Sequence, residues 1–234
     1  MKIKGVQELT LIDYPEKIAC TIFLYGCNLR CGFCHNPELV LKDELPDVSK
    51  EDVLKFLEKR TRQLEGVCFT GGEPLMTLEI DFLQQIKDMG YKIKLDTNGC
   101  FPERLQGLIE RGLVDYVAMD IKSSPEHYAD LTEMIVDITK IERSIKLIVE
   151  NMKDYEFRTT IIQDVHTQEE VKKMVEWILQ VAGRKPKLIA LQGFKNQGKF
   201  VDKFFKKVDD TSELHLRELR YQIKGDFEKV EIRV

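Results

Sequence analysis

The sequence predicts an α/β fold in which helices cover a parallel β-sheet. About six short apolar runs, rich in Ile, Val, Phe and Tyr, alternate along the chain with amphipathic helix-like segments. There is no internal repeat and no low-complexity linker, and 234 residues suit a single domain of this kind. Both an open doubly wound sheet and a partial barrel agree with the pattern.

The expected elements follow one another in a regular order. Strands are predicted at 17–25, 66–70, 91–95, 113–119, 157–162, 187–191 and, at the end, 230–234. Helices are predicted at 49–62, 77–89, 102–111, 135–151, 168–181 and 212–223. Ser49 is a typical N-cap residue, Gly90 stands where a C-cap glycine is expected, and Pro102 suits a first helical turn. Residues 1–14 are expected outside the repeat, as an extended piece or hairpin.

Four unusual features each follow a different predicted strand. They are the cysteine-rich stretch Cys27–Cys34, the turn Gly71–Pro74, the segment Asp96–Gly99, and Asp120 with Lys122. The carboxyl ends of parallel strands meet at one rim of a sheet or barrel, where ligands gather. We therefore expect these four features to converge on one site.

Three cysteines, Cys27, Cys31 and Cys34, have the spacing C-x3-C-x2-C. Three thiolates can hold an iron–sulfur cluster by three irons and leave the fourth iron open for chemistry. Three other interpretations remain open at this point. The cysteines could form one buried face of a helix, or join His35 in a zinc site, or belong to a disulfide network.

Composition excludes several classes of protein. The formal net charge of −4 argues against a broad nucleic-acid-binding surface. No apolar run approaches the roughly 20 residues of a membrane span, and the first residues lack the apolar stretch of a signal peptide. We expect a cytoplasmic protein without membrane or nucleic-acid partners. In that reducing compartment cysteines stay as thiols or bind metal.

The stretch Gly26–Asn36, with Phe33 before the third cysteine, resembles the signature of radical S-adenosylmethionine (SAM) enzymes. Gly71-Gly72-Glu73-Pro74 is similar to the second motif of that superfamily. The stretch Leu11–Pro15 resembles activating proteins of anaerobic ribonucleotide reductase and of pyruvate formate-lyase. The resemblance covers roughly residues 5–195. It implies a partial (β/α)6 barrel in one domain, with an N-terminal extension 1–16, a core 17–195 and a C-terminal helix and strand 196–234.

The resemblance implies a four-iron four-sulfur (4Fe-4S) cluster on Cys27, Cys31 and Cys34, and SAM beside it. The residues it implies for cofactor binding are Phe33, Gly71, Gly72, Glu73, Asp96, Asn98, Lys122 and Arg158. It also implies a monovalent cation held by Asp96, Thr97 and Asp120, together with the backbone carbonyl of Ala118. Gly71 and Gly72 are expected to let the backbone approach the ligand closely.

The implied activity is that of an oxidoreductase that cleaves SAM reductively and uses the 5′-deoxyadenosyl radical to take a hydrogen atom. In the activating enzymes this hydrogen comes from a glycine of a glycyl-radical enzyme, resembling anaerobic ribonucleotide reductase or formate-lyase. The alternative is modification of a small molecule or nucleotide. A flavodoxin or ferredoxin is expected as electron donor, by analogy with the family.

The remaining cysteines lack the paired spacing of a second cluster, so one cluster is expected. Cys20 and Cys68 lie inside predicted strands and are interpreted as buried apolar residues. Cys100 follows a strand end, where it is either buried or a reactive thiol.

Several other positions keep two interpretations. His166 either lines the rim of the site or is structural. The family pattern has a histidine after the sixth strand, which this chain lacks, so Gln192 or Phe194 is a candidate substitute. The stretch 195–207 is basic with interleaved phenylalanines, and is either a docking surface or a helix with an apolar stripe.

Overall fold

One mixed sheet of eight strands forms the centre of the computed structural model, which describes residues 1–234. Strand β1 (Ile3–Thr10) runs antiparallel to β2 (Ala19–Leu24), and every later strand is parallel to its predecessor. The later strands are β3 (Gly66–Gly71), β4 (Lys92–Thr97), β5 (Tyr116–Asp120), β6 (Asp154–Ile161), β7 (Leu188–Gly193) and β8 (Lys229–Arg233).

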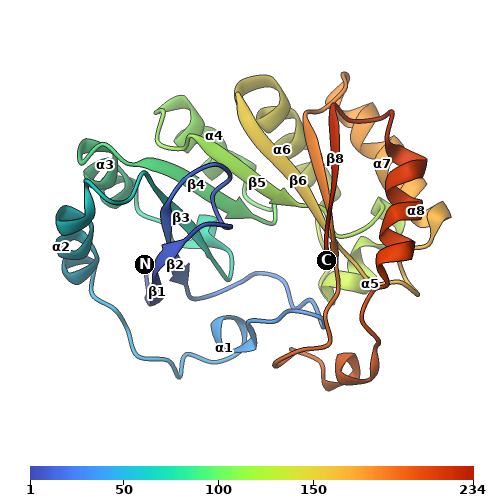
Figure 1. Ribbon diagram of the computed structural model, residues 1–234, viewed down its shortest axis with the longest axis horizontal. Coiled ribbons are helices and arrows are strands. Elements are labelled where there is room, and N and C mark those ends of the chain that lie inside the picture. Colours follow the sequence, from blue (N-terminus) through green and yellow to red (C-terminus); the bar gives the residue numbers. More distant parts are fainter.

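The order of the strands in the sheet is the order of the strands in the sequence. A doubly wound sheet reverses its strand order at one point, whereas a barrel winds in one direction. The continuous order therefore identifies a partial barrel. Its edge strands, β1 and β8, do not pair with each other, and Figure 1 shows the curved sheet open between them.

The seven parallel strands, β2 to β8, agree with the seven predicted ranges, and one further strand comes from the N-terminal segment. The N-terminal segment, which was expected outside the repeat, supplies β1. In the β1–β2 pair, Ile3 lies opposite Leu24 at one end and Thr10 lies opposite Ala19 at the other, with two irregularities in register between them. The final strand predicted at 230–234 is present as β8.

Six longer helices lie on the outer face of the sheet (Figure 1) and agree with the six predicted. They are α2 (Lys50–Arg60), α3 (Ile80–Asp88), α4 (Pro102–Glu110), α6 (Ile138–Asn151), α7 (Gln168–Ala182) and α8 (Glu213–Ile223). Shorter pieces are α1 (Pro37–Val40), α5 (Tyr128–Thr132) and the 3-10 turns η1 (Pro74–Met76), η2 (Pro125–His127) and η3 (Lys203–Lys207). No helix is both long and apolar enough to cross a membrane.

Side-chain alternation gives the sheet two different faces. Ile93, Leu95 and Phe157 belong to the main hydrophobic core, which fills the space between sheet and helices. Their neighbours Lys94 and Glu156 are equally buried but point to the other face of the same strands, because successive side chains alternate. The expectation of nearly continuous apolar strands was therefore wrong for the inner face. Polar residues of this inner face, among them Asp96, Asp120 and Arg158, line the candidate site.

Candidate active site

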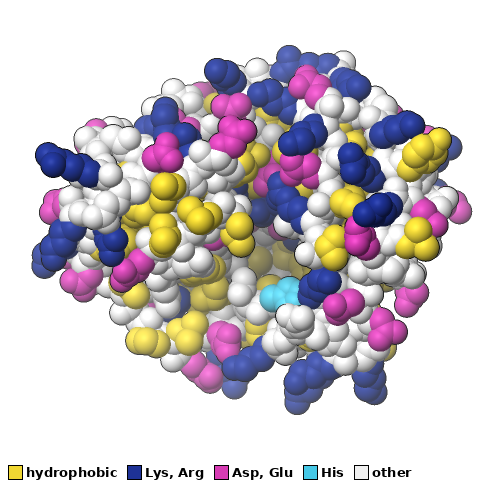
Figure 2. Space-filling view, in the orientation of Figure 1, with side chains coloured by type: hydrophobic (Ala, Val, Ile, Leu, Met, Phe, Trp, Pro, Cys, Tyr) yellow, Lys and Arg dark blue, Asp and Glu magenta, His cyan; other side chains and the backbone are white.

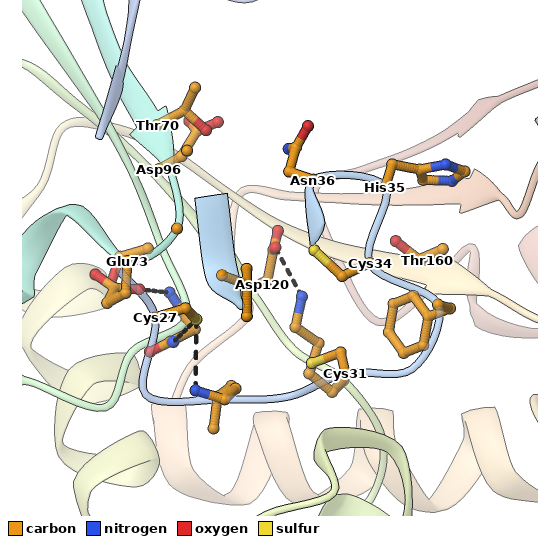
Figure 3. A pocket seen from close by; sticks show the side chains of 18 of the residues that line it. Cys27, Cys31, Cys34, His35, Asn36, Thr70, Glu73, Asp96, Asp120 and Thr160 are labelled. Carbon is orange, nitrogen blue, oxygen red and sulfur yellow. Dashed lines mark hydrogen bonds and ion pairs between the residues drawn. The ribbon is translucent and has the colours of Figure 1, made fainter. Parts of the chain in front are cut away.

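A pocket opens at the carboxyl ends of strands β2 to β6, as the positions of the four sequence features predicted. Ala118, expected at the cation through its backbone carbonyl, does not line the pocket, whereas all the other residues expected for the cofactors do: Cys27, Cys31, Phe33, Cys34, Gly71, Gly72, Glu73, Asp96, Thr97, Asn98, Asp120, Lys122 and Arg158. Figure 3 shows the three cysteines around one cavity, with Glu73 beside Cys27 and with His35 and Asn36 on the side of Cys34.

The cysteines lie on a loop that local hydrogen bonds hold open. Arg30 Nη1 donates to the carbonyl oxygens of Cys27 and Leu29, at 2.7 and 2.8 Å. The Arg30 backbone N–H donates to Thr132 O at 3.0 Å, which ties the loop to the end of α5. Burial raises the pKa of the Cys27 thiol to about 12, and it also raises the pKa values of Cys31 and Cys34. Such thiols keep their protons at neutral pH unless a metal ion, such as iron, binds the sulfur and displaces the proton.

The other interpretations of the cysteines do not fit this geometry. The segment is a loop rather than a helix, and all six cysteines are free thiols. The His35 ring stacks on Phe194 and lies 5.0 Å from the Phe200 ring, and its Nδ1 lies 3.2 Å from Gln197 O. No three His, Cys, Asp or Glu side chains come close enough to hold a single metal ion, as zinc would require. In a cubane cluster each thiolate binds a different iron, so the sulfurs need not meet at one point.

The two glycines of the second motif face protein backbone rather than open space. A Cβ on Gly72 would lie 2.0 Å from Gly26 O, and one on Gly71, whose φ is +120°, would lie 2.4 Å from Leu24 O. The N–H groups of Gly72 and Glu73 donate to Leu24 O and Gly26 O, at 2.8 and 2.7 Å. Both glycines also line the pocket, so the expected close approach of their backbone to a ligand stays a prediction. The missing side chains let this turn lie against the start of the cysteine loop.

Glu73 is buried, and both of its carboxylate oxygens are used inside the protein. It accepts hydrogen bonds from the Leu75 N–H at 3.0 Å, the Thr97 hydroxyl at 2.9 Å and the Asn98 N–H at 2.6 Å. Burial raises the pKa of Glu73 to about 7, although these three donors oppose the shift. Glu73 thus joins the ends of β3 and β4 and acts on the pocket by positioning the two loops.

Asn98 continues this chain of contacts to the cysteine loop. Its Nδ2 donates to Asn28 Oδ1 at 2.8 Å, and its Oδ1 accepts from the Cys100 N–H at 3.0 Å. The second contact is the local turn that Asn side chains favour. These contacts make Asn98 a cap of its own loop, and since it also lines the pocket, its expected contact with a cofactor stays a prediction.

Five charged side chains of alternating sign cross the inner face of β4, β5 and β6. We call this set the charge row: Lys94, Asp96, Arg158, Asp120 and Lys122. Arg158 donates to Asp96 Oδ2 at 3.0 Å and to Asp120 Oδ1 at 2.9 Å. Lys122 donates to Asp120 Oδ2 at 2.8 Å, and Lys94 pairs with Asp96 Oδ1. Burial alone would raise the pKa of Asp120, but Arg158 and Lys122 hold it well below its usual value.

The charge row does not fit the monovalent cation expected at Asp96, Thr97 and Asp120. Each of the four carboxylate oxygens already accepts a contact from a cationic side chain. The Thr97 hydroxyl is directed to Glu73. Three side-chain cations face two carboxylates, so a further cation would meet net repulsion. Lys94 supplies the charge that this expectation assigned to an ion.

Sequence reasoning missed some residues of the site. Thr160 lines the pocket two residues after Arg158, and Lys94 lies two residues before Asp96. The two-residue period of a strand could have indicated both, once their partners were recognised as pointing inward. Thr70, Asn36 and His35 also line the pocket and directly adjoin the motifs that were recognised.

Other candidates lie outside the pocket. His166 is buried behind it, with Nδ1 accepting the Ile162 N–H at 3.0 Å and Nε2 2.9 Å from Lys122 O, so it supports the loop at Lys122. Neither Gln192 nor Phe194 lines the pocket. Cys100 is buried, and this burial raises its pKa to about 11, which favours the buried interpretation over the reactive one. The predictions that Cys20 and Cys68 are buried are confirmed.

Comparison with known proteins identifies the family. The family model of the "Radical SAM superfamily" matches residues 21–178, a stretch that contains the three cysteines, the glycine turn and the whole charge row. The chain belongs to the radical SAM superfamily. Enzymes of this superfamily use a 4Fe-4S cluster and SAM. The cysteine loop and the polar, glycine-edged pocket fit these two groups.

Individual relatives agree with the family. The chain is 30% identical, over 99% of its length, to a Methanocaldococcus jannaschii protein named "Putative glycyl-radical enzyme activating enzyme", covering 95% of that protein. It is 32% identical to a pyruvate formate-lyase-activating enzyme of Listeria monocytogenes, over 56% of this chain and 57% of that one. A solved domain of such an enzyme from Bacteroides vulgatus has a TM-score of 0.58 at 22% identity, and the match covers 72% of this chain and 99% of that domain. This last match shows the fold alone.

Proposed function

We propose that this radical SAM enzyme activates a glycyl-radical enzyme by removing a hydrogen atom from one of its glycines. The observation that carries the proposal is the similarity to the Methanocaldococcus jannaschii protein, which extends over nearly the full length of both chains. The shorter match to pyruvate formate-lyase-activating enzymes supports the same assignment.

In this proposal Cys27, Cys31 and Cys34 bind three irons of the cluster and leave one iron without a protein ligand. When bound, the cluster and SAM would supply the one-electron reductive chemistry by which the family forms a 5′-deoxyadenosyl radical. Lys122, on the pocket wall, pairs with the carboxylate of the methionine part. Arg158 holds Asp96 and Asp120 in place across three strands. Glu73 and Asn98 hold the glycine turn and the cysteine loop together, so the pocket keeps its shape.

The partner glycine has to reach this pocket from outside. The barrel stays open between β1 and β8, and Figure 2 shows the molecule hollowed near the middle of the same face. We expect the partner to be an enzyme of the anaerobic ribonucleotide reductase or formate-lyase type.

The test combines the reconstituted, reduced protein with SAM and a purified glycyl-radical enzyme under anaerobic conditions. We expect a glycyl doublet in the electron paramagnetic resonance spectrum, and none with Cys31→Ala in place of the wild type. SAM cleavage without a doublet in either type of partner would contradict the proposal. It would favour a small molecule or nucleotide as the hydrogen donor.

A further inference from the structure

The C-terminal segment 194–208 covers the outer side of the cysteine loop. The Asp202 N–H donates to Gly32 O at 3.0 Å. A Cβ on Gly32 would lie 2.7 Å from both Phe205 Cε2 and Glu133 Oε1, so the two segments touch with no room between them. Whatever binds the outer side of this segment therefore lies one layer of protein away from the cysteines.

Aromatic rings lead from the surface of this segment to the cysteine loop. The Phe204 side chain is 61% exposed, and its ring lies 5.8 Å from that of Phe205. The Phe205 ring lies 5.9 Å from that of Phe33, the residue directly before Cys34. Two ring contacts thus separate solvent from the cysteine loop.

Three lysines lie within three residues of Phe204 in the sequence. Lys203, Lys206 and Lys207 are exposed and make no ion pair, whereas Lys195 and Lys199 pair with Asp210 and Glu38. The nearby Asp202 caps the turn by accepting the Phe204 N–H at 2.8 Å. Figure 2 shows Lys and Arg side chains gathered along the lower edge of the molecule, below the hollow. We call Lys203, Phe204, Lys206 and Lys207 the η3 patch.

The η3 patch is separate from the pocket, because none of its residues lines it. A hydrogen donor has to enter the pocket, since the radical forms there. An electron donor has only to come close to the cysteine loop. The patch is therefore placed for an electron donor and leaves the pocket free for a substrate.

We propose that the η3 patch is the docking site of an acidic one-electron carrier protein. The chain as a whole has a net charge of −4, whereas the patch is a local cluster of three unpaired lysines, which attracts an acidic carrier. An apolar centre with a charged rim is the usual form of a small, transient interface. One electron leaves the carrier and enters the cluster held by Cys27, Cys31 and Cys34, and no atom is transferred. This inference depends on the reductive chemistry of the family and not on the identity of the hydrogen donor.

The test is the triple variant Lys203→Glu, Lys206→Glu, Lys207→Glu, with a purified acidic ferredoxin as the probe. We expect the dissociation constant for oxidised ferredoxin, measured by calorimetry at low salt, to rise at least about tenfold. Ferredoxin-driven formation of 5′-deoxyadenosine should fall at least about tenfold, while dithionite-driven formation stays within about twofold. The matched control is Lys55→Glu, Lys59→Glu, Arg62→Glu on and after α2, which reverses the same charge elsewhere and should leave both measurements unchanged.

Several results would overturn the docking site. They are an unchanged ferredoxin affinity, an equal loss in the control variant, or an equal loss with dithionite. If the glutamate variant does not fold, the glutamine triple variant at the same positions gives the same comparison with smaller changes. In the wild type, ferredoxin affinity that does not weaken with added salt would also contradict the proposal.

Discussion

Lys94 is a fully buried lysine whose ammonium group pairs with Asp96 at one end of the charge row. It lies against Asp96 and 5.9 Å from the centre of the Tyr116 ring. Arg158 takes the other oxygen of Asp96, so this carboxylate is satisfied by side chains alone. A buried charge is tolerated only when it is paired, and the pairing here is complete.

The exchange of Lys94 for Met should lower the free energy of unfolding by about 3 kcal/mol, because it leaves one oxygen of a buried carboxylate unpaired. We also expect SAM to bind the reconstituted wild type equally well with potassium or with tetramethylammonium as the only cation. The variant should bind SAM more tightly in potassium, which is small enough to replace the ammonium group. Isothermal titration calorimetry measures both.

The control for this variant is Lys92→Met, on the same strand but exposed and paired with Asp115. This control exchange should lower the free energy of unfolding by less than about 1 kcal/mol. A wild type that loses SAM affinity when potassium is removed would contradict the role given to Lys94.

Glu73 gives the site a pH-dependent stability. Its pKa is about 7 in the folded protein, above the ordinary value of 4.5, so the folded state holds this proton more tightly than the unfolded state does. Protonated Glu73 therefore contributes on the order of 3 kcal/mol to the free energy of unfolding. This contribution is complete below about pH 4.5 and is lost as the pH rises toward 7. Glu73→Gln cannot titrate, and its amide donor would face the Asn98 N–H, which costs about 1–3 kcal/mol.

The free energy of unfolding of the wild type should therefore exceed that of Glu73→Gln. The difference should be largest near pH 5 and smallest near pH 8. Denaturant unfolding of the cluster-free proteins across this range measures the difference. A difference that widens with rising pH would show that the buried carboxyl group does not have the raised pKa.

At the scale of elements, the turn after β3 depends on two glycines that lie against the backbone of the preceding strand end. Gly72→Ala should cost about 3 kcal/mol or more, because the clash is with Gly26 O and no side chain can move to relieve it. The variant should also incorporate less iron during reconstitution, since the cysteine loop begins at that point. Gly225→Ala is the control, because its Cβ would meet nothing within 4 Å. Equal stability and iron content in the two variants would contradict this account of the turn.

The elements also explain how far the sequence alone could lead. All six long helices and the parallel strands follow from periodicity, and the site follows from the positions of four features at strand ends. For residues 1–14 the prediction stayed general, an extended piece or hairpin, because an antiparallel edge strand with exposed Leu9 carries no strong pattern. Lys94 was missed because a lysine is expected at the surface, and only the inward register of β4 places it in the barrel.

At the scale of the whole molecule, the open barrel separates two approaches to one site. In the two proposals made above, the substrate enters the hollow between the sheet edges, and the electron arrives through the η3 patch on the outer side of the cysteine loop. Segments from opposite ends of the chain meet there, since His35 packs against Phe194 and Phe200. Trimming the chain after β7 should therefore expose the cysteine loop, and we expect such a protein to lose its cluster quickly in air. Iron retention over time measures this loss, and a truncated protein that keeps its iron as long as the full chain would contradict it.

The central claim is that the radical formed in this pocket takes its hydrogen from a partner glycine. The most direct measurement uses a glycyl-radical enzyme in which glycine alone carries deuterium at its α-carbon. Mass spectrometry then follows 5′-deoxyadenosine formed during activation. The account predicts that 5′-deoxyadenosine gains one deuterium in proportion to the glycyl signal. Unlabelled 5′-deoxyadenosine, formed in the same amount with and without the partner, would contradict it.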